Sequence, residues 1–145
     1  MLNLLLLAHA GVTLYMMGLI WFVQVVHYTL FNRIGSNVFT TYEQAHTQLT
    51  TLVVGPPMLL EAATTGLLLI VRPTDVSLVQ AGIGAFLLAI IWLSTMFLQV
   101  PQHGILSNGF DQAAYQFLVN SNWIRTIAWS ARGFLALWMI SSVMK

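Results

Sequence analysis

The chain has 145 residues, of which 58% are hydrophobic and only 6% are charged, and its mean hydropathy is +0.81. A soluble domain carries about a quarter charged residues, so this composition predicts a membrane protein. The lack of cysteine excludes disulfides and thiolate ligands, and a net charge of +1 without a basic stripe gives no support for nucleic-acid binding.

The first apolar run occupies residues 2–31. Its start resembles a secretory signal, because Ala8-His9-Ala10 has the small-x-small pattern of a cleavage site. No basic residue precedes the run, however, and the run continues well past that site. Spanning a bilayer takes roughly 20 mainly apolar residues, so we predict one membrane-spanning helix here.

Three further apolar runs follow, at residues 49–71, 78–100 and 123–144. Arg72 and Pro73 end the second run with a charge and a helix breaker. Four spans place both termini on one side of the membrane. We therefore predict an all-α integral membrane four-helix bundle, built from two transmembrane hairpins in a single domain over the whole chain.

In each hairpin one polar segment joins the two helices, at residues 32–48 in the first and residues 107–122 in the second. Ser36 or Asn37 has the side chain to cap a helix, and Asp111 follows an Asn-Gly turn signal near another helix start. We expect two long loops that carry short interfacial helices. Basic residues lie at both membrane faces in equal number, so the positive-inside rule leaves the sidedness undetermined.

The two hairpins contain short, weakly similar sequences. QVVH, residues 24–27, closes the first apolar run, and QVPQH, residues 99–103, closes the third. The spacing differs between the copies, so an internal duplication is a hypothesis only.

Polar residues of all four helices are expected at one membrane face. In the first span, steps of three and four place Gln24 and His27 on one stripe. Spans one and three end, and spans two and four begin, at the same face. Because lipid does not solvate polar groups, these side chains should point into the bundle, into a cavity or towards a partner. The predicted polar face comprises Gln24, His27, Glu43, His46, Gln99, His103 and Arg125.

The histidines of this face are the candidate ligands of a cofactor. His27, His46 and His103 could hold a transition metal or the central ion of haem or another tetrapyrrole, with Gln24 and Gln99 hydrogen-bonding them. None of the local spacings HxxxH, HExxH or CxxCH occurs. A purely structural role, with hydrogen bonds to water or to a neighbouring helix, therefore stays open, and so does the identity of any metal.

Two charges lie deeper in the apolar runs. Glu61 is about a dozen residues into the second run and Arg132 about ten into the fourth, which at about 1.5 Å per residue puts both roughly 15 to 18 Å from the same face. A lone charge at the bilayer centre costs on the order of 3 kcal/mol, so the matching depth predicts an intramembrane ion pair. Gly55-Pro56-Pro57, just before Glu61, predicts a kink that frees backbone carbonyls.

Three stretches carry a family resemblance: IWFVQVVHYTLFNRIG, VVGPPMLLE and QVPQHGILSNGFDQAAYQFLVNSNWIRTIAWSARG. They resemble a family of small bacterial four-helix integral membrane proteins, and the resemblance implies that fold without implying an activity. More distantly, the chain resembles the haem-binding membrane protoporphyrinogen oxidases and the copper-resistance D proteins, which also have a histidine in the first helix of a compact bundle. His9 would match the first-helix histidine of those oxidases, but their internal lysine has no counterpart before Lys145.

These observations favour an accessory or structural subunit of a larger membrane complex, of bioenergetic type, in the bacterial inner membrane. The chain has no catalytic motif such as GxSxG, and an enzymatic role is not indicated. Small residues around Gly82 and Gly84 suit close helix contact, so the expected partners are the lipid bilayer and other membrane subunits. The first alternative is a redox protein that holds haem, another tetrapyrrole or a metal, and the second is a transporter of small solutes or ions.

Overall fold

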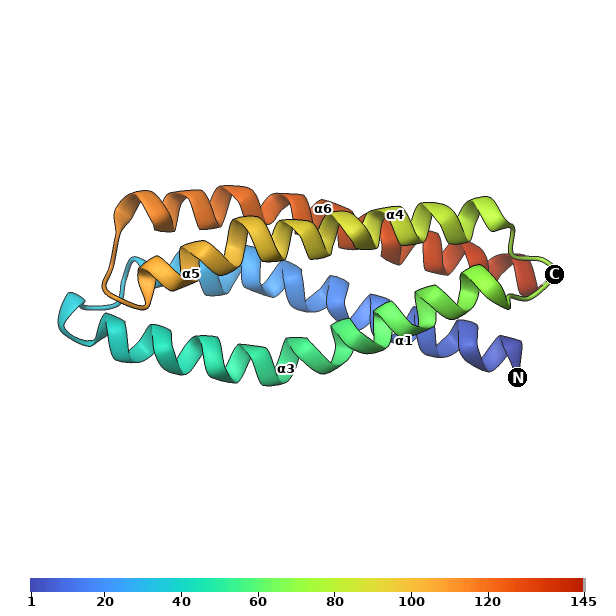
Figure 1. Ribbon diagram of the computed structural model, residues 1–145, viewed down its shortest axis with the longest axis horizontal. Helices are drawn as coiled ribbons and strands as arrows, with labels where there is room; N and C mark the ends of the chain where they lie inside the picture. The colour runs from blue at the N-terminus through green and yellow to red at the C-terminus, as the bar shows by residue number, and fades with distance from the viewer. Residues whose placement is uncertain (145) are drawn as a thin grey trace.

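Four long helices run along the full length of the bundle in the computed structural model, which describes residues 1–144 (Figure 1). Two of them include a π-helical segment, labelled η. In chain order the elements are α1 (Leu2–Phe22), η1 (Val23–His27), α2 (Tyr28–Phe31), α3 (Ser36–Ile70), α4 (Leu78–Ser94), η2 (Thr95–Gln99), α5 (Val100–Leu106) and α6 (Gln112–Val143). Lys145 lies outside the described residues.

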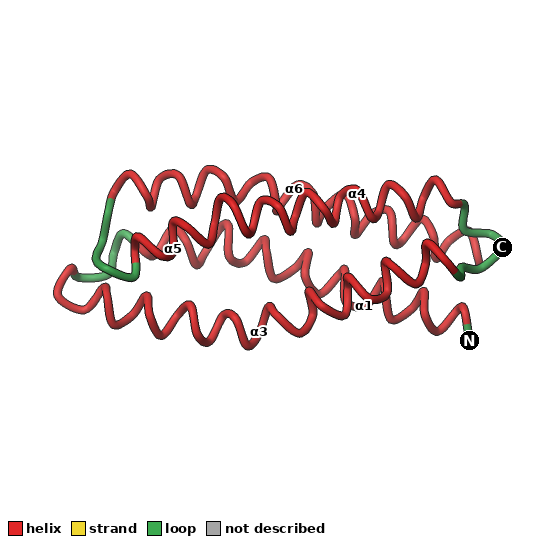
Figure 2. Tube along the Cα trace, viewed as in Figure 1, coloured by secondary structure: helices red, strands yellow, loops and turns green. Residues whose placement is uncertain are grey.

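Within residues 1–144, loops occur only at the two ends of the bundle (Figure 2). The connections at residues 32–35 and 107–111 lie at one end, called here the connection end. The start of α1, the end of α6 and the connection at residues 71–77 lie at the opposite end, called the terminal end. The prediction of four long helices with no strand is confirmed over residues 1–144.

Three of the long helices are long and apolar enough to cross a membrane, at Leu2–Phe31, Ser36–Ile70 and Leu78–Leu106. This composition is that of an integral membrane protein. The fourth long helix, α6, is of similar length but more polar. Large apolar side chains on the outer surface of the bundle include Leu52, Ile70, Phe86, Phe97 and Phe134.

Side chains cap the N-termini of two helices, α4 and α6. Ser77 and Gln80 form a capping box at the start of α4, in which Ser77 Oγ accepts from Gln80 N at 3.1 Å and Gln80 Oε1 accepts from Ser77 N at 2.8 Å. At the start of α6, Asp111 Oδ1 accepts from Ala114 N at 2.7 Å, so the prediction of a helix start near Asp111 is confirmed. Gly109 precedes it with a φ of +146°, which glycine adopts without strain.

The prediction of long loops with short interfacial helices is wrong. α3 begins at Ser36 and α6 at Gln112, and both continue without a break into the predicted spans. The N-cap residue of α3 is Gly35, without a side-chain capping bond, rather than Ser36 or Asn37. The polarity of these segments is compatible with a helix as well as with a loop: several of their polar residues, such as Gln44 and Gln116, are exposed on continuous helices, whereas Glu43 is 0% exposed.

Prolines bend the helices without ending them. α3 stays helical through Pro56 and Pro57 and changes direction near them (Figure 1). Since proline has no N–H, the carbonyls of Leu52 and Val53 lack their usual helical donors. Pro101 lies in the first turn of α5, just after η2, where a missing N–H is tolerated, and the helix continues to Leu106.

Buried apolar side chains form three clusters along the bundle axis. The cluster at the connection end contains Tyr28, Phe31, Phe39, Leu106, Ala114, Tyr115 and Leu118. The middle cluster contains Met16, Ile20, Met58, Ile91, Ala128 and Trp129. The cluster nearest the terminal end contains Leu6, Leu68, Val76, Leu135 and Met139. Buried polar side chains, including Gln24, Glu43, Gln99 and Arg125, lie among these clusters, and several of them form the site described next.

Candidate functional site

Both π-helical segments overlap the similar sequences QVVH, residues 24–27, and QVPQH, residues 99–103. A π-helical turn holds one residue more than an α-helical turn and is found frequently at functional sites. Gln24 lies in η1 and Gln99 ends η2, and they are 3% and 1% exposed. Each glutamine binds to α6, where Gln24 Nε2 donates to the Val119 carbonyl at 3.3 Å and Gln99 Nε2 donates to Ser121 Oγ at 3.0 Å. Their amide oxygens accept from Asn122 Nδ2 at 2.8 Å and from Ser94 Oγ at 3.0 Å, so the described residues show no hydrogen bond from either glutamine to a histidine.

The three predicted histidines meet near the connection end. His27 Nε2 lies 2.9 Å from His46 Nδ1, and the ring centroids of His46 and His103 are 5.3 Å apart. Thr50 Oγ1 also lies 3.0 Å from His46 Nδ1. Because Nδ1 of His46 is engaged in this way, its Nε2 is the ring nitrogen left for a ligand.

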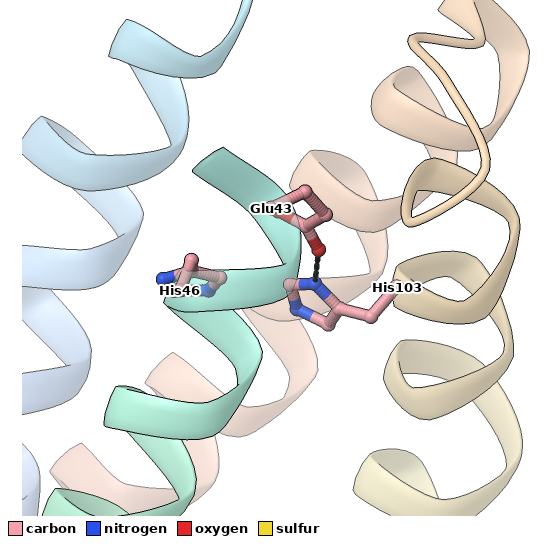
Figure 3. A group of neighbouring side chains, drawn as sticks. All are labelled: Glu43, His46 and His103. Atoms are coloured by element: carbon pink, nitrogen blue, oxygen red, sulfur yellow. Dashed lines mark hydrogen bonds and ion pairs between the residues drawn. The ribbon is translucent and has the colours of Figure 1, made fainter. Parts of the chain in front are cut away.

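Glu43 completes the cluster. Its Oε1 lies 2.5 Å from Nδ1 of His103, and Figure 3 shows the His103 ring reaching from α5 to the Glu43 carboxylate on α3. Glu43 is fully buried, and its second oxygen, Oε2, has no hydrogen-bond partner among residues 1–144. A buried carboxylate oxygen without a donor is unfavourable by about 1 to 3 kcal/mol or more, so this atom has capacity for a cation or a further donor.

The cluster has the composition and spacing of a metal site. One ligand atom each from Glu43, His46 and His103 can be chosen so that all lie within 4.8 Å of one another. Metal–ligand bonds of about 2.0 to 2.2 Å require these atoms to approach somewhat more closely. Two histidines and one carboxylate are the ligand set of many catalytic zinc and non-haem iron sites, which keep open coordination positions.

A chain of hydrogen bonds leads from this cluster to Arg125. The Tyr28 hydroxyl lies 3.1 Å from His103 Nε2 and accepts from Arg125 Nη2 at 3.3 Å. Arg125 also donates through Nε to Asn122 Oδ1 at 2.9 Å and through Nη1 to Thr95 Oγ1 at 3.4 Å. Sequence reasoning missed the role of Tyr28. Its signal was the step of four from Gln24, which places it on the polar stripe of the first helix.

A pocket of about 690 Å³ adjoins the cluster. It lies between α3 on one side and α4, η2 and α5 on the other, with α1 and α6 completing its wall. Its polar lining near the connection end includes Tyr28, His46, His103 and Arg125. The rest of the lining is mostly apolar and includes Met16, Ile20, Val54, Met58, Trp92 and Trp129. Ligand sites in proteins commonly have this size and this combination of an apolar wall with a few polar groups.

The deeper charges form a separate, fully hydrogen-bonded network. Arg132 Nε lies 2.9 Å from Glu61 Oε1, so the predicted pair is present, with the two side chains 1% and 0% exposed. Glu61 also accepts from Thr13 Oγ1 at 3.1 Å and from Trp129 Nε1 at 2.9 Å. Arg132 further donates to Thr65 Oγ1 at 3.1 Å and to the Gly84 carbonyl. With every group satisfied, this network holds all four long helices together.

His9 lies beside that network and far from the other histidines. Its Nδ1 is 3.1 Å from Thr64 Oγ1. His9 is therefore not part of the histidine cluster near the connection end.

Comparison of the chain with protein-family models, with curated proteins and with solved structures finds no match. The family resemblance and the similarity of His9 to the oxidase histidine therefore stay predictions. The geometry of the histidine cluster and of the pocket is the basis for assigning a function.

Proposed function

We propose that this chain is an integral membrane metalloprotein that holds a divalent transition-metal ion with Glu43, His46 and His103. The observation that carries the proposal is the convergence of three ligand atoms, from α3 and α5, within 4.8 Å of one another. The unpartnered Oε2 of the buried Glu43 supports it, because a cation would satisfy this oxygen.

The surrounding hydrogen bonds suit a metal centre. Ligating histidines usually engage their second ring nitrogen with a neighbouring acceptor or donor, which fixes the ring orientation. His27 and Thr50 fill this role for His46, and Tyr28 lies within hydrogen-bond distance of His103. Imidazole and carboxylate ligands without a thiolate favour zinc, iron or manganese among the divalent ions.

We further propose that α6 is the fourth span, so that the bundle consists of two transmembrane hairpins. α6 packs against both α1 and α4, which directs its polar residues Asn122, Arg125 and Arg132 inwards. Its outer face carries apolar side chains, including Ile127, Phe134 and Trp138, which are 58% to 66% exposed. Such a face is compatible with lipid.

The test is metal binding by the purified protein in detergent or nanodiscs. We expect elemental analysis to find about one zinc, iron or manganese ion per chain, and Co²⁺ substituted for it to give visible d–d bands shaped by nitrogen and oxygen ligands. Glu43→Gln and His103→Gln should each weaken metal binding by at least about 10- to 100-fold. His9→Gln is the matched control, because His9 is a buried histidine outside the cluster. Metal-free protein that also fails to bind added Zn²⁺ or Fe²⁺ at micromolar concentration would refute the proposal.

Haem or another tetrapyrrole is the second candidate ligand, because the histidine cluster opens onto a pocket of about 690 Å³ that His46 lines. An imidazole nitrogen at the wall of an apolar pocket is the arrangement of an axial haem ligand. Absorption spectroscopy after addition of haem separates this candidate from a metal ion. No Soret shift, or a shift that persists in His46→Gln, would exclude axial ligation by His46.

Membership in a larger complex and location in the bacterial inner membrane stay predictions. The exposed apolar residues on the outer surface of the bundle would contact lipid or partner helices equally well. Native electrophoresis in a mild detergent tests the subunit role, since a lone small species at every detergent concentration would count against it.

A further inference from the structure

Arg125 carries a buried charge without an acidic partner. It is 8% exposed, and its hydrogen-bond partners among the described residues are the neutral oxygens of Tyr28, Asn122 and Thr95. The nearest carboxylate along the hydrogen-bond chain is Glu43, which is bound to His103. By contrast, Arg132 is paired directly with Glu61. Buried charges in a low-dielectric environment are normally paired, so Arg125 is the exception.

The same arginine lines the pocket near the connection end, and a buried polar group without a partner belongs to a residue of the apolar wall. Trp92 lines the pocket, and its buried Nε1 has no hydrogen-bond partner among residues 1–144. Buried indole N–H groups usually find an acceptor. A positive charge at the wall of a pocket favours a ligand that brings a negative charge and oxygen acceptors.

The pocket reaches the outer surface of the bundle between α3 and the η2–α5 segment. Its lining includes Leu59, Met96 and Val100, which are 64%, 55% and 58% exposed. Gly55 and Gly104 also lie along it, and a Cβ added at either would meet no atom within 4 Å. Because this outer surface is apolar, a ligand would enter from the bilayer rather than from water.

We propose that the pocket binds a lipid-soluble carboxylate, with its carboxylate on Arg125 and its apolar body between Trp92, Trp129 and Met58. The second hydrogen on Nη1 of Arg125 has no partner among the described residues and can donate to a carboxylate oxygen, and the carboxylate would compensate the charge of the guanidinium. The aromatic and methionine side chains suit an acyl chain or a flat ring system. The inference concerns Arg125 and the pocket wall, and it does not depend on a metal ion at Glu43.

The test compares an acid with its neutral ester. Dibromostearic acid quenches tryptophan fluorescence on contact, and its methyl ester has the same chain without the charge. With chelator-treated protein in nanodiscs, we expect the acid to quench saturably and the ester to bind about 10- to 100-fold more weakly, as the loss of one charged hydrogen-bonding group predicts. A bromonaphthoic acid in a parallel arm distinguishes a ring carboxylate from a fatty acid. Saturable binding of either acid supports the proposal.

Variants locate the binding. Arg125→Gln should reduce the preference for acid over ester to less than about twofold, whereas Arg33→Gln, which removes a cation outside the pocket, should leave it unchanged. Gly104→Leu should block acid binding, and Gly82→Leu is its matched control, because a Cβ there also meets nothing and Gly82 does not line the pocket.

Three outcomes would overturn the proposal. They are equal binding of acid and ester by the wild-type protein, no saturable quenching by either acid, and acid binding that persists in Gly104→Leu. If Arg125→Gln does not fold, the comparison of acid with ester in the wild-type protein and the Gly104→Leu variant still test whether the pocket binds a carboxylate. Loss of metal binding in Glu43→Gln with retained acid binding would separate this inference from the metal proposal.

Discussion

Glu61→Gln tests whether the ion pair between the long helices stabilises the fold. Glu61 is 0% exposed and accepts hydrogen bonds from Arg132, Thr13 and Trp129 at 2.9 to 3.1 Å. The substitution keeps the shape of the side chain but leaves the guanidinium of Arg132 buried without a counter-ion. Breaking a buried pair in this way is unfavourable by about 3 to 5 kcal/mol, a large part of a typical unfolding free energy of about 5 to 15 kcal/mol.

The assay is thermal and denaturant unfolding of the purified protein in one detergent, together with the yield of monodisperse protein. Glu61→Gln and Arg132→Gln should each lower stability by that amount, and the double variant should be less destabilised than the sum of the two, because it leaves no unpaired charge. Asp75→Asn is the control, since Asp75 is an exposed acid in the connection at the terminal end and should change stability by less than about 0.5 kcal/mol. Wild-type stability of both single variants would refute the reasoning.

Three smaller effects follow from the local geometry, each measured by the same unfolding assay. Ser77→Ala removes the capping box of α4 and should lower stability by about 1 kcal/mol, whereas no change would show that the cap is dispensable. Gly133→Val should lower it by about 1 to 3 kcal/mol, because even a Cβ there would lie 2.5 Å from Met17 Sδ, while Gly18→Val meets no such contact and should be milder. Tyr28→Phe removes the hydroxyl between the histidine cluster and the arginine and should lower stability by about 1 kcal/mol, and unaltered stability would contradict the bonds drawn to it.

Helical spacing in the first span predicted most of its buried positions. His9, Gln24 and the positions between them at steps of three and four are buried. After η1, Tyr28 and Phe31 are 2% and 0% exposed, whereas His27, at the end of η1, is only half-buried. The π-helical turn inserts one residue, which rotates the following side chains by about 100° relative to a continuous α-helix. No feature of the sequence marks such a turn, so the partial exposure of His27 was not predicted.

The loop prediction failed because polarity was taken as a sign of irregular structure. Residues 36–48 and 112–122 are polar, but they belong to continuous helices on which some polar residues, such as Gln44 and Gln116, are exposed. A few others point into the bundle, where Glu43 bonds to His103 and Asn122 to Gln24. A continuous helix that carries polar residues and a polar loop can have the same local composition.

The sequence by itself determined the class of the protein, the presence of four long helices and the depth of the paired charges. These properties depend on hydropathy and on distance along a helix, which each segment carries locally. Only the tertiary structure decided that Glu43, His46 and His103 meet, that Gln24 and Gln99 bind to α6, and that Arg125 faces a pocket without an acid beside it. These properties depend on the rotation of each helix about its axis and on the bend of α3, which are set by contacts between segments far apart in the chain.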